Sequence, residues 1–341
     1  MSQQTPFIGP LGEVRLIERI RRILGPAVDD RVVLGIGDDA AAVKVAEDKL
    51  LLLTCDIQIE NTHFRRKDLS AYQLGRRAMA VNLSDLASMG GSPAFALASL
   101  GLPPNLPLSD FDDLFAGMRD RLAEFRATII GGNLARSTDR TIVDITLVGE
   151  VAAGKLLTRS GARPGDRIYV TGTVGSSAAG YHVLEQLGGA GKDDFAELVR
   201  AHLSPEPRVR AGLEIAGASA ATSMIDLSDG LARDLLRVCE SSRVGAEVSF
   251  EHLPIEPDLV RAAQELGKDP AELVLGGGED YELLFTVSPR VSSDRIRHIA
   301  SASATPMTEI GTILPPEAGC RWVDGSGRRR PLEPSGWEHF S

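Results

Sequence analysis

The sequence is poor in cysteine and in aromatic residues, and it contains no long apolar run. Its 341 residues include only three cysteines, Cys55, Cys239 and Cys320, and no two of them form a C-x-x-C pair. This spacing argues against a disulfide framework or a structural zinc site and predicts a reduced, cytoplasmic setting. No stretch approaches ~18 consecutive apolar residues, so we expect no membrane-spanning helix. Residues 1–10 lack the basic-then-apolar order of a signal peptide.

Positive charge is also in short supply. Lysine and arginine number 37 against 47 aspartates and glutamates, which gives a formal net charge of −10. Such a protein repels duplex nucleic acid and anionic membranes, so neither is expected as a partner. Small anionic substrates would be repelled as well unless metal ions intervened. The 5% aromatic content offers little surface for base stacking.

The length and the apolar content predict a globular chain of two domains. With 43% hydrophobic residues the chain can bury a core, and 341 residues exceed one ordinary core. A segment rich in glycine, basic residues and proline, 154–165, is the predicted boundary, dividing the chain into 1–150 and 151–341. Strand-like runs alternate with helical stretches, among them an amphipathic helix predicted over 11–24, so the fold class is mixed α/β.

Acidic residues recur where apolar, strand-like runs end. Ligands bind at strand ends in α/β sheets, and carboxylates are the ligands that Mg²⁺ accepts. Any one of these acids is better explained as a helix cap or a turn residue. Five such sites together favour a shared magnesium site, because the acids would repel one another without cations. The sites are Asp38 and Asp39, Asp56, Asp85, Asp226 and Asp229, and Glu279 and Asp280.

Two sequences resemble phosphate-binding loops but fail in detail. Gly149–Lys155 matches the first seven letters of a P-loop, but Leu156 stands where Ser or Thr should reach magnesium. Gly35–Ala40 resembles a dinucleotide fingerprint, but its two acids would repel a pyrophosphate. The triplet Leu-Ser-Asp occurs at 83–85 and 227–229, which hints at two related halves.

Three further residues have both an ordinary and a functional interpretation. His63 is either a surface histidine or a ligand beside the acids. Arg159 is either a solvated linker residue or a guanidinium clamp on phosphate. Trp337 is either a packing anchor or a flat surface for a heteroaromatic ligand, and packing is the commoner role.

Seven segments, in order along the chain, resemble the thiamine-monophosphate kinase family, and the likeness runs from about residue 11 to the C-terminus. Any one segment would be weak, whereas the set is specific. The segments are Gly-Ile-Gly-Asp-Asp-Ala (35–40), Asn-Thr-His-Phe (61–64), Ala-Val-Asn-Leu-Ser-Asp-Leu-Ala (80–87), Leu-Thr-Arg-Ser-Gly-Ala (157–162), Pro-Gly-Asp (164–166), Ile-Asp-Leu-Ser-Asp-Gly (225–230) and Gly-Gly-Glu-Asp-Tyr-Glu (277–282).

The resemblance implies a fold, a reaction and a set of site residues. The fold would be that of aminoimidazole-ribonucleotide synthetase, a homodimer in which two N-terminal domains pair into an intersubunit β-barrel and each C-terminal domain is a separate α/β unit. The reaction would convert ATP and thiamine monophosphate to ADP and thiamine diphosphate. By motif matching, several Mg²⁺ ions would be held by Asp39, Thr54, Cys55, Asp56, Asp85, Asn133, Asp226 and Asp229; ATP by Gly132, Asn133, Arg159 and Ser228; and thiamine monophosphate by His63, Glu279 and Trp337.

Two positions depart from the family pattern. Asn133 stands where the family usually has Asp, and Cys55 stands where it usually has a hydroxyl residue. Asparagine offers magnesium a neutral oxygen but no charge, and at position 55 a backbone carbonyl could suffice. Two alternatives follow: a non-catalytic paralogue that binds nucleotide or thiamine phosphate, and another ATP-dependent enzyme of the same superfamily.

The expected chemistry needs no catalytic side chain that accepts a proton. The acceptor is a phosphate oxygen, and a phosphate monoester with a second pKa of about 6 is largely dianionic near neutral pH. The obstacle is the repulsion between this dianion and ATP, which magnesium ions bridging both phosphates would screen. We therefore expect direct in-line transfer without a phosphoenzyme.

Overall fold

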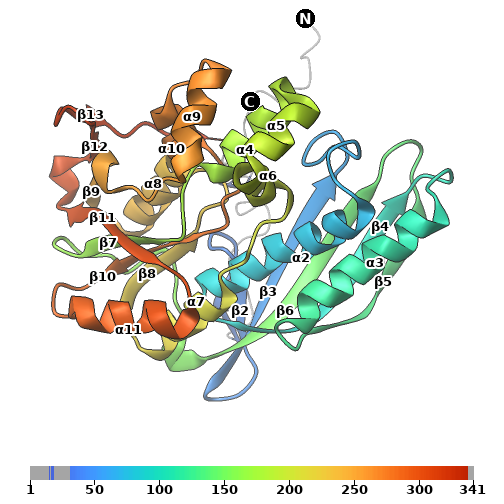
Figure 1. Ribbon diagram of the computed structural model, residues 1–341. Helices are drawn as coiled ribbons and strands as arrows, with labels where there is room; N and C mark the ends of the chain where they lie inside the picture. Colours follow the sequence, from blue (N-terminus) through green and yellow to red (C-terminus); the bar gives the residue numbers. More distant parts are fainter. Residues whose placement is uncertain (1–14, 16, 19–30, 337–341) are drawn as a thin grey trace, which may run out of the picture.

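The computed structural model describes residues 15, 17, 18 and 31–336. The helix predicted over 11–24 lies almost wholly outside the described residues, and so does Trp337. The described chain forms two halves, each built on its own β-sheet (Figure 1). Among the described residues no helix is both long and apolar enough to cross a membrane.

The N-terminal half is a six-stranded sheet with helices α2 (Ala71–Ser88) and α3 (Leu108–Ala123) packed side by side against it (Figure 1). The strand order is β1-β2-β3-β6-β4-β5. Only the β4–β5 pair is parallel, and α3 connects these two strands. The strands are β1 (Val32–Leu34), β2 (Ala41–Lys44), β3 (Lys49–Ile59), β4 (Ser92–Leu102), β5 (Thr128–Arg136) and β6 (Ile142–Ala152).

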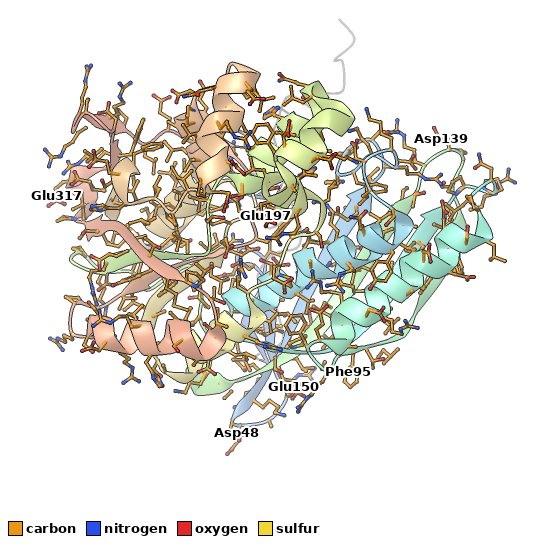
Figure 2. All side chains as sticks on the ribbon, in the orientation of Figure 1. Asp48, Phe95, Asp139, Glu150, Glu197 and Glu317 are labelled. Atoms are coloured by element: carbon orange, nitrogen blue, oxygen red, sulfur yellow. The ribbon has the colours of Figure 1, made fainter. Side chains whose placement is uncertain are left out.

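Alternation along β3 decides which side chains face the helices. Leu50, Leu52 and Thr54 are buried against them, whereas Cys55 and Ile57 are exposed on the opposite face. Successive strand residues point to opposite faces, so this pattern follows from the two-residue period of the strand. β4 alternates in the same way, and its Phe95, labelled in Figure 2 on the all-side-chain view, is 47% exposed.

Helix α2 runs without a break through 81–85. Ser70 caps its start by accepting the N–H of Gln73, whose side chain accepts the N–H of Ser70 in return. The segment 81–85 continues the helix because its apolar side chains pack on both sheets. Asp85 therefore lies inside a helix and not at a strand end.

The C-terminal half is a seven-stranded sheet of order β13-β12-β9-β11-β7-β10-β8. All its neighbouring pairs are antiparallel except the parallel pair of β12 and β9. Its strands are β7 (Arg167–Thr171), β8 (Ala221–Asp226), β9 (Gly245–Ser249), β10 (Leu283–Val287), β11 (Met307–Leu314), β12 (Cys320–Val323) and β13 (Arg329–Pro331). Its α-helices are α4 (Ser176–Gln186), α5 (Gly188–Asp194), α6 (Ala196–Leu203), α7 (Val209–Gly217), α8 (Leu231–Ser242), α9 (Pro257–Leu266), α10 (Pro270–Gly276) and α11 (Ser293–Ser303).

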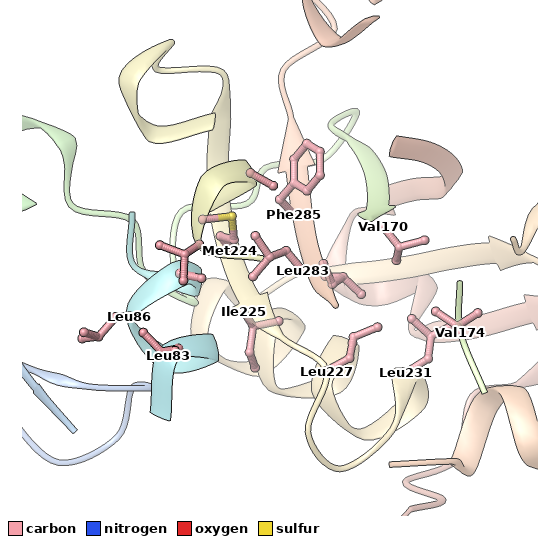
Figure 3. Packing of buried hydrophobic residues seen from close by; sticks show 14 of the residues in the cluster. Leu83, Leu86, Val170, Val174, Met224, Ile225, Leu227, Leu231, Leu283 and Phe285 are labelled. Carbon is pink, nitrogen blue, oxygen red and sulfur yellow. The ribbon is translucent and has the colours of Figure 1, made fainter. Parts of the chain in front are cut away.

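One hydrophobic core joins the two halves. Leu83 and Leu86 of α2 lie beside Met224 and Ile225 of β8, and all four are at most 1% exposed (Figure 3). Helix α2 also packs against α7. Because α2 belongs to the N-terminal half and contacts both sheets, its position fixes one half against the other.

Several predicted strand ends were misplaced. Asp56 lies within β3, which continues to Ile59, and Gly132 and Asn133 lie within β5. Glu279 and Asp280 precede β10 and do not end a strand. Asp56 is held inside a regular strand by the neighbouring strand β6, which local turn preference does not register.

The structure also tests the Leu-Ser-Asp repeat and the two sequences that resemble phosphate-binding loops. The two Leu-Ser-Asp copies lie in different contexts, one inside α2 and one in the loop before α8, so they give no support to related halves. Gly149 to Ala152 belongs to β6, in agreement with the rejection of a P-loop. Gly35–Ala40 leads into β2 and not into a helix, so it lacks the helix N-terminus that a dinucleotide site needs.

Close packing of α2 on α3 generates a stability prediction. A Cβ built on Gly117 would lie 2.0 Å from the carbonyl oxygen of Tyr72, inside the space where the two helices touch. We expect Gly117→Ala to lower the free energy of unfolding by about 1–3 kcal/mol, because the backbones must separate. Urea denaturation measures this change.

The matched control is Gly217→Ala in α7, where an added Cβ meets no atom within 4 Å. That variant should be as stable as the wild type or slightly more so, since alanine favours helix by up to about 1 kcal/mol over glycine. Equal effects of the two substitutions would contradict the packing account.

Candidate active site

A cleft of about 1410 Å³ lies at the junction of the two halves. Its walls include β3 and α2 from the N-terminal half and the loops after β8 and before β10 from the C-terminal half. The predicted residues that line it are Asp39, Thr54, Cys55, Asp56, His63, Asp85, Arg159, Asp226, Ser228, Asp229 and Glu279. The structure thus brings most of the predicted site together.

The inner face of β3 meets the polar side of α2 at the floor of the cleft. The Thr54 hydroxyl donates a hydrogen bond to the Asp85 carboxylate. The backbone N–H of Asp56 donates to the side-chain oxygen of Asn82 over 3.1 Å. Thr54 and Asp56 share this face because they are two residues apart in a strand.

Asp226 closes the cleft from the other half. It ends β8 and is 2% exposed. Ser84 of α2 donates a hydrogen bond of 2.6 Å to its carboxylate. Burial and the nearby charge of Asp39 raise the pKa of Asp226 well above its usual range.

The acids on the floor destabilise one another when ionised. Burial raises the pKa of Asp56 to about 6, and the charges of Asp229, Asp144 and Asp39 act in the same direction. Burial, then Asp56 and Asp226, raise the pKa of Asp85. These carboxylates therefore hold protons tightly in the absence of a cation.

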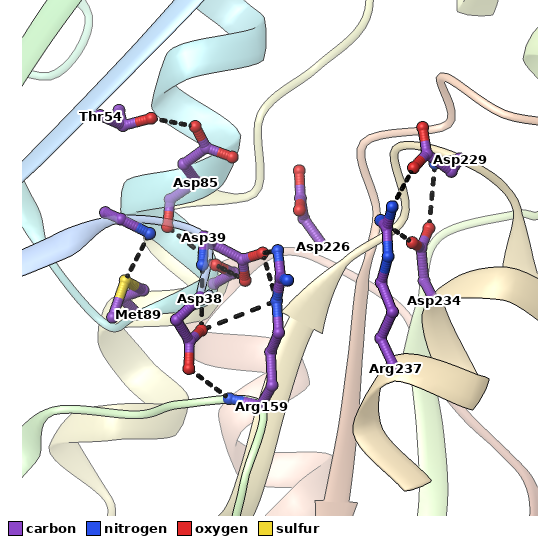
Figure 4. A network of polar contacts seen from close by, with 12 residues as sticks. Asp38, Asp39, Thr54, Asp85, Met89, Arg159, Asp226, Asp229, Asp234 and Arg237 are labelled. Carbon is purple, nitrogen blue, oxygen red and sulfur yellow. Dashed lines mark hydrogen bonds and ion pairs between the residues drawn. The ribbon is translucent and has the colours of Figure 1, made fainter. Parts of the chain in front are cut away.

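Arg159 pairs with the acids that follow β1 (Figure 4). Its guanidinium donates to Asp39 through Nε over 2.9 Å and through Nη2, and its backbone N–H donates to Asp38 over 3.2 Å. Ser88 of α2 donates to the other oxygen of Asp39 over 2.7 Å. Burial and the charge of Asp39 raise the pKa of Asp38 to about 6 in spite of Arg159.

A second arginine, Arg237 of α8, holds Asp229 on the opposite side (Figure 4). It lies 2.5 Å from the Asp229 carboxylate and 2.8 Å from that of Asp234. Asp234 is fully buried and also accepts the backbone N–H of Asp229 over 3.0 Å. Burial raises the pKa of Asp234 to about 7. Asp234 and Arg237 were not among the predicted site residues; the signal that could have found them is their i, i+3 spacing just after Asp229-Gly230.

The side chains that line the cleft include the type of ligand atom that magnesium prefers. They offer carboxylates and a hydroxyl, which are oxygen ligands. Within the described part of the chain, however, no group of three or more His, Cys, Asp or Glu side chains converges closely enough to hold a metal ion. Asp39 and Asp229 are instead paired with Arg159 and Arg237.

Gly132, Asn133 and the thiol of Cys55 are placed differently from the other predicted groups, although Cys55 itself lines the cleft. The Cys55 thiol lies on the outer face of the sheet and donates to Asp144 over 3.0 Å. Gly132 and Asn133 lie in the edge strand β5, three strands from β3 in the sheet order, or about 14 Å at ordinary strand spacing. Neither lines the cleft. The sequence motif identified these positions, but only the strand order shows that they are far from the acids.

The acids before β10 have three separate roles. The Glu279 carboxylate accepts a hydrogen bond from Arg77 at the cleft wall. Asp280 accepts the backbone N–H groups of Gly175 and Ser177 at the start of α4, over 2.6 and 3.1 Å. Glu282 is buried and accepts two hydrogen bonds of 2.6 Å from Arg208. Asp280 is thus a helix cap, as the ordinary interpretation held, and only Glu279 lines the cleft.

Comparisons with known proteins agree with this geometry. Residues 37–151 match the family model of the AIR synthase related protein N-terminal domain, and residues 163–321 match that of its C-terminal domain. Thiamine-monophosphate kinase of Aquifex aeolicus is 35% identical over 97% of this chain and 98% of its own length. The Escherichia coli thiamine-monophosphate kinase is 36% identical over the same shares.

Solved structures show the same likeness. AaThiL complexed with AMPPCP and TMP aligns with a TM-score of 0.84 and 33% identity, covering 98% of this chain and 99% of that chain. Hydrogenase maturation protein HypE, at 18% identity and a TM-score of 0.67, shares the fold alone.

The two-domain fold and the acid-lined cleft at its junction define an AIR synthase related protein. Within that class, the chain belongs to the thiamine-monophosphate kinase family, because relatives at 35–36% identity align over nearly the whole of both chains.

The raised pKa of Asp56 generates a prediction for the metal-free protein. An acid whose pKa rises from 3.8 to about 6 on folding destabilises the folded state as pH rises through that value. We expect Asp56→Asn to be more stable than the wild type near pH 8, by about 1–3 kcal/mol, with the difference shrinking toward pH 4. Urea denaturation in a chelator measures it.

The exposed Asp112 of α3 provides the matched control, and Asp112→Asn should leave stability unchanged at both pH values. The account fails if Asp56→Asn is the less stable protein near pH 8, or if its advantage is the same at every pH.

Proposed function

We propose that the protein is an ATP-dependent thiamine-phosphate kinase, which transfers the γ-phosphoryl group of ATP to thiamine monophosphate and releases ADP and thiamine diphosphate. The observation that carries this proposal is the set of buried and half-buried carboxylates that line one cleft, drawn from both halves of a chain that aligns throughout with thiamine-monophosphate kinases. The setting is proposed to be the cytoplasm, which the free state of all three cysteines supports.

The carboxylates would serve as ligands and not as acids or bases. When bound, magnesium would supply the positive charge that lets two polyanions meet in a protein of net charge −10. The protein would hold it through Asp39, Thr54, Asp56, Asp85, Asp226 and Asp229, with the backbone carbonyl of Cys55 as a further oxygen. The Cys55 thiol is turned away from the cleft.

Arginine and loop residues would orient the two substrates. Arg159 and Ser228 line the cleft and are proposed to contact ATP. The forked guanidinium of arginine suits phosphate oxygens. His63 and Glu279 also line the cleft and are proposed to contact thiamine monophosphate. Trp337, which lies outside the described residues, is proposed to contact it as well. The acceptor phosphate carries its own nucleophilic oxygen, so transfer would be direct and in line.

The exposed outer face of the N-terminal sheet supports assembly into a homodimer. The outer face of the N-terminal sheet exposes Ile57, Phe95 and Leu97 by 43–47%, and β5 exposes Ile130 by 62%. An exposed apolar sheet face of this kind marks an interaction site. We propose that two such sheets pair into an intersubunit β-barrel. The proposed domains are 1–150, which dimerises and carries most acids, and 151–341, which completes the site.

The dimer also bears on the predicted ATP contacts of Gly132 and Asn133. The register pairs Asn133 with Ser99, and Ser99 pairs with Asp144, so Asn133 shares the outer face with Cys55 and Asp144. In one chain these residues lie away from the cleft, so a nucleotide contact from them requires a second subunit. The same argument applies to Asn133 as a magnesium ligand.

Turnover tests the proposed function directly. Purified protein with ATP, Mg²⁺ and thiamine monophosphate should form ADP and thiamine diphosphate, with little ADP when the acceptor is left out. Asp85→Asn should lower kcat by about 100-fold or more, since it removes charge from the metal site, whereas Asp112→Asn should not. Substrate binding without product would refute the kinase and favour a binding paralogue.

A charge placed on the sheet face tests the dimer. We expect Leu97→Arg to sediment as a monomer and to lose activity, because it puts an unpaired charge into an apolar interface. Val260→Arg, at a residue of α9 with the same 43% exposure, should stay dimeric and active. Sedimentation velocity measures both. A wild-type monomer with full activity, or a dimeric Leu97→Arg, would overturn the proposal.

A further inference from the structure

Arg77 is a fully buried arginine whose three guanidinium nitrogens donate hydrogen bonds to three different parts of the chain. It belongs to α2 and is 1% exposed. Its Nη2 donates to the Glu279 carboxylate, its Nη1 to the backbone carbonyl of His202, and its Nε to the Gln58 side chain over 3.3 Å. One side chain therefore joins β3 and α2 of the N-terminal half to α6 and the loop before β10 of the C-terminal half.

Glu279 is held in an uncommon conformation at the cleft wall. Its φ of +65° lies in the left-handed region, and its N–H donates to the carbonyl of Ser228 over 2.7 Å. Non-glycine residues keep such a conformation only where surrounding contacts impose it. Its side chain is 29% exposed and lines the cleft. The loop thus presents one carboxylate to the ligand space.

The charges around Glu279 keep it ionised. Burial by itself favours the neutral acid, but nearby positive charge, that of Arg77 first, outweighs it and lowers the pKa of Glu279. His202 lies 3.5 Å from the second carboxylate oxygen, and burial and Arg77 lower its pKa to about 4. At neutral pH His202 is therefore uncharged, and Arg77 is the permanent cation beside Glu279.

We propose that Arg77 is a positioning residue for recognition of the acceptor: it holds the Glu279 carboxylate as an anion facing the cationic heterocycle of thiamine monophosphate. This inference rests on the proposed function. Arginine suits the task because its rigid fork satisfies several acceptors at once, which a lysine ammonium on a flexible chain does not. Because the proposed function assigns Glu279 to thiamine monophosphate, we expect the contact to act on the acceptor and not on ATP.

Steady-state kinetics of four proteins test the proposal: wild type, Arg77→Met, Glu279→Gln and the double variant. We expect Arg77→Met to raise KM for thiamine monophosphate by about tenfold or more, with KM for ATP changed by less than about twofold. Glu279→Gln should do the same, and the double variant should be no worse than either single one, because both remove one interaction.

Arg77→Lys keeps the charge and is the conservative variant. It should recover part of the affinity for thiamine monophosphate, whereas a merely structural contact between the halves would raise both KM values or lower kcat alone. If Arg77→Met fails to fold, Arg77→Lys and Glu279→Gln carry the comparison. Equal effects on the two substrates, additive effects in the double variant, or no effect would overturn the inference.

Failure of the proposed kinase function can be distinguished from failure of the Arg77 inference. If the kinase function fails, the wild type itself forms no thiamine diphosphate. The same variants are then compared by calorimetric titration with thiamine monophosphate, and an affinity that Arg77→Met and Glu279→Gln leave unchanged sinks the inference as well.

Discussion

Mutual repulsion among buried carboxylates is the constraint on which the site depends. Asp56, Asp85 and Asp226 approach one another from two halves of the chain, and burial raises the pKa of each. A fold that only needed stability would not gather them, since burying like charges costs free energy. Arg159 and Arg237 offset part of this cost by pairing with Asp39 and Asp229. The arrangement makes physical sense as a cation site for two anionic substrates.

Helix α2 carries much of this arrangement. Its residues Arg77, Ser84, Asp85 and Ser88 reach, in turn, Glu279, Asp226, Thr54 and Asp39. Spacings of seven, eight and eleven residues place them on one side of a helix, where they form a polar stripe. Leu83 and Leu86 pack the same helix against β8. The hydrophobic core and the polar site are therefore two faces of one element, and the helix transmits the position of each half to the other.

Much of the candidate site could be predicted from sequence, because its acids stand in motifs that resemble a known family. The mixed α/β fold and the grouping of Asp39, Asp226 and Asp229 in one cleft agree with prediction. Asp56 and Asp85 were predicted at strand ends but lie inside a strand and a helix. Tertiary packing holds them there, and local turn preference does not reveal it. Arg77 escaped prediction because nothing in α2 itself marks an arginine whose partner is 202 residues away. The remote position of Asn133 follows from strand order, which periodicity does not give.

Proton release on magnesium binding tests the central claim most directly. If burial and mutual repulsion raise the pKa values of the floor acids, Mg²⁺ must displace their protons when it binds with a non-hydrolysable ATP analogue. Calorimetric titration in buffers of different ionisation enthalpy counts them. The account predicts net release of protons by the protein near pH 6, and a much smaller release in Asp85→Asn. Binding of Mg²⁺ near pH 6 without proton release would contradict it.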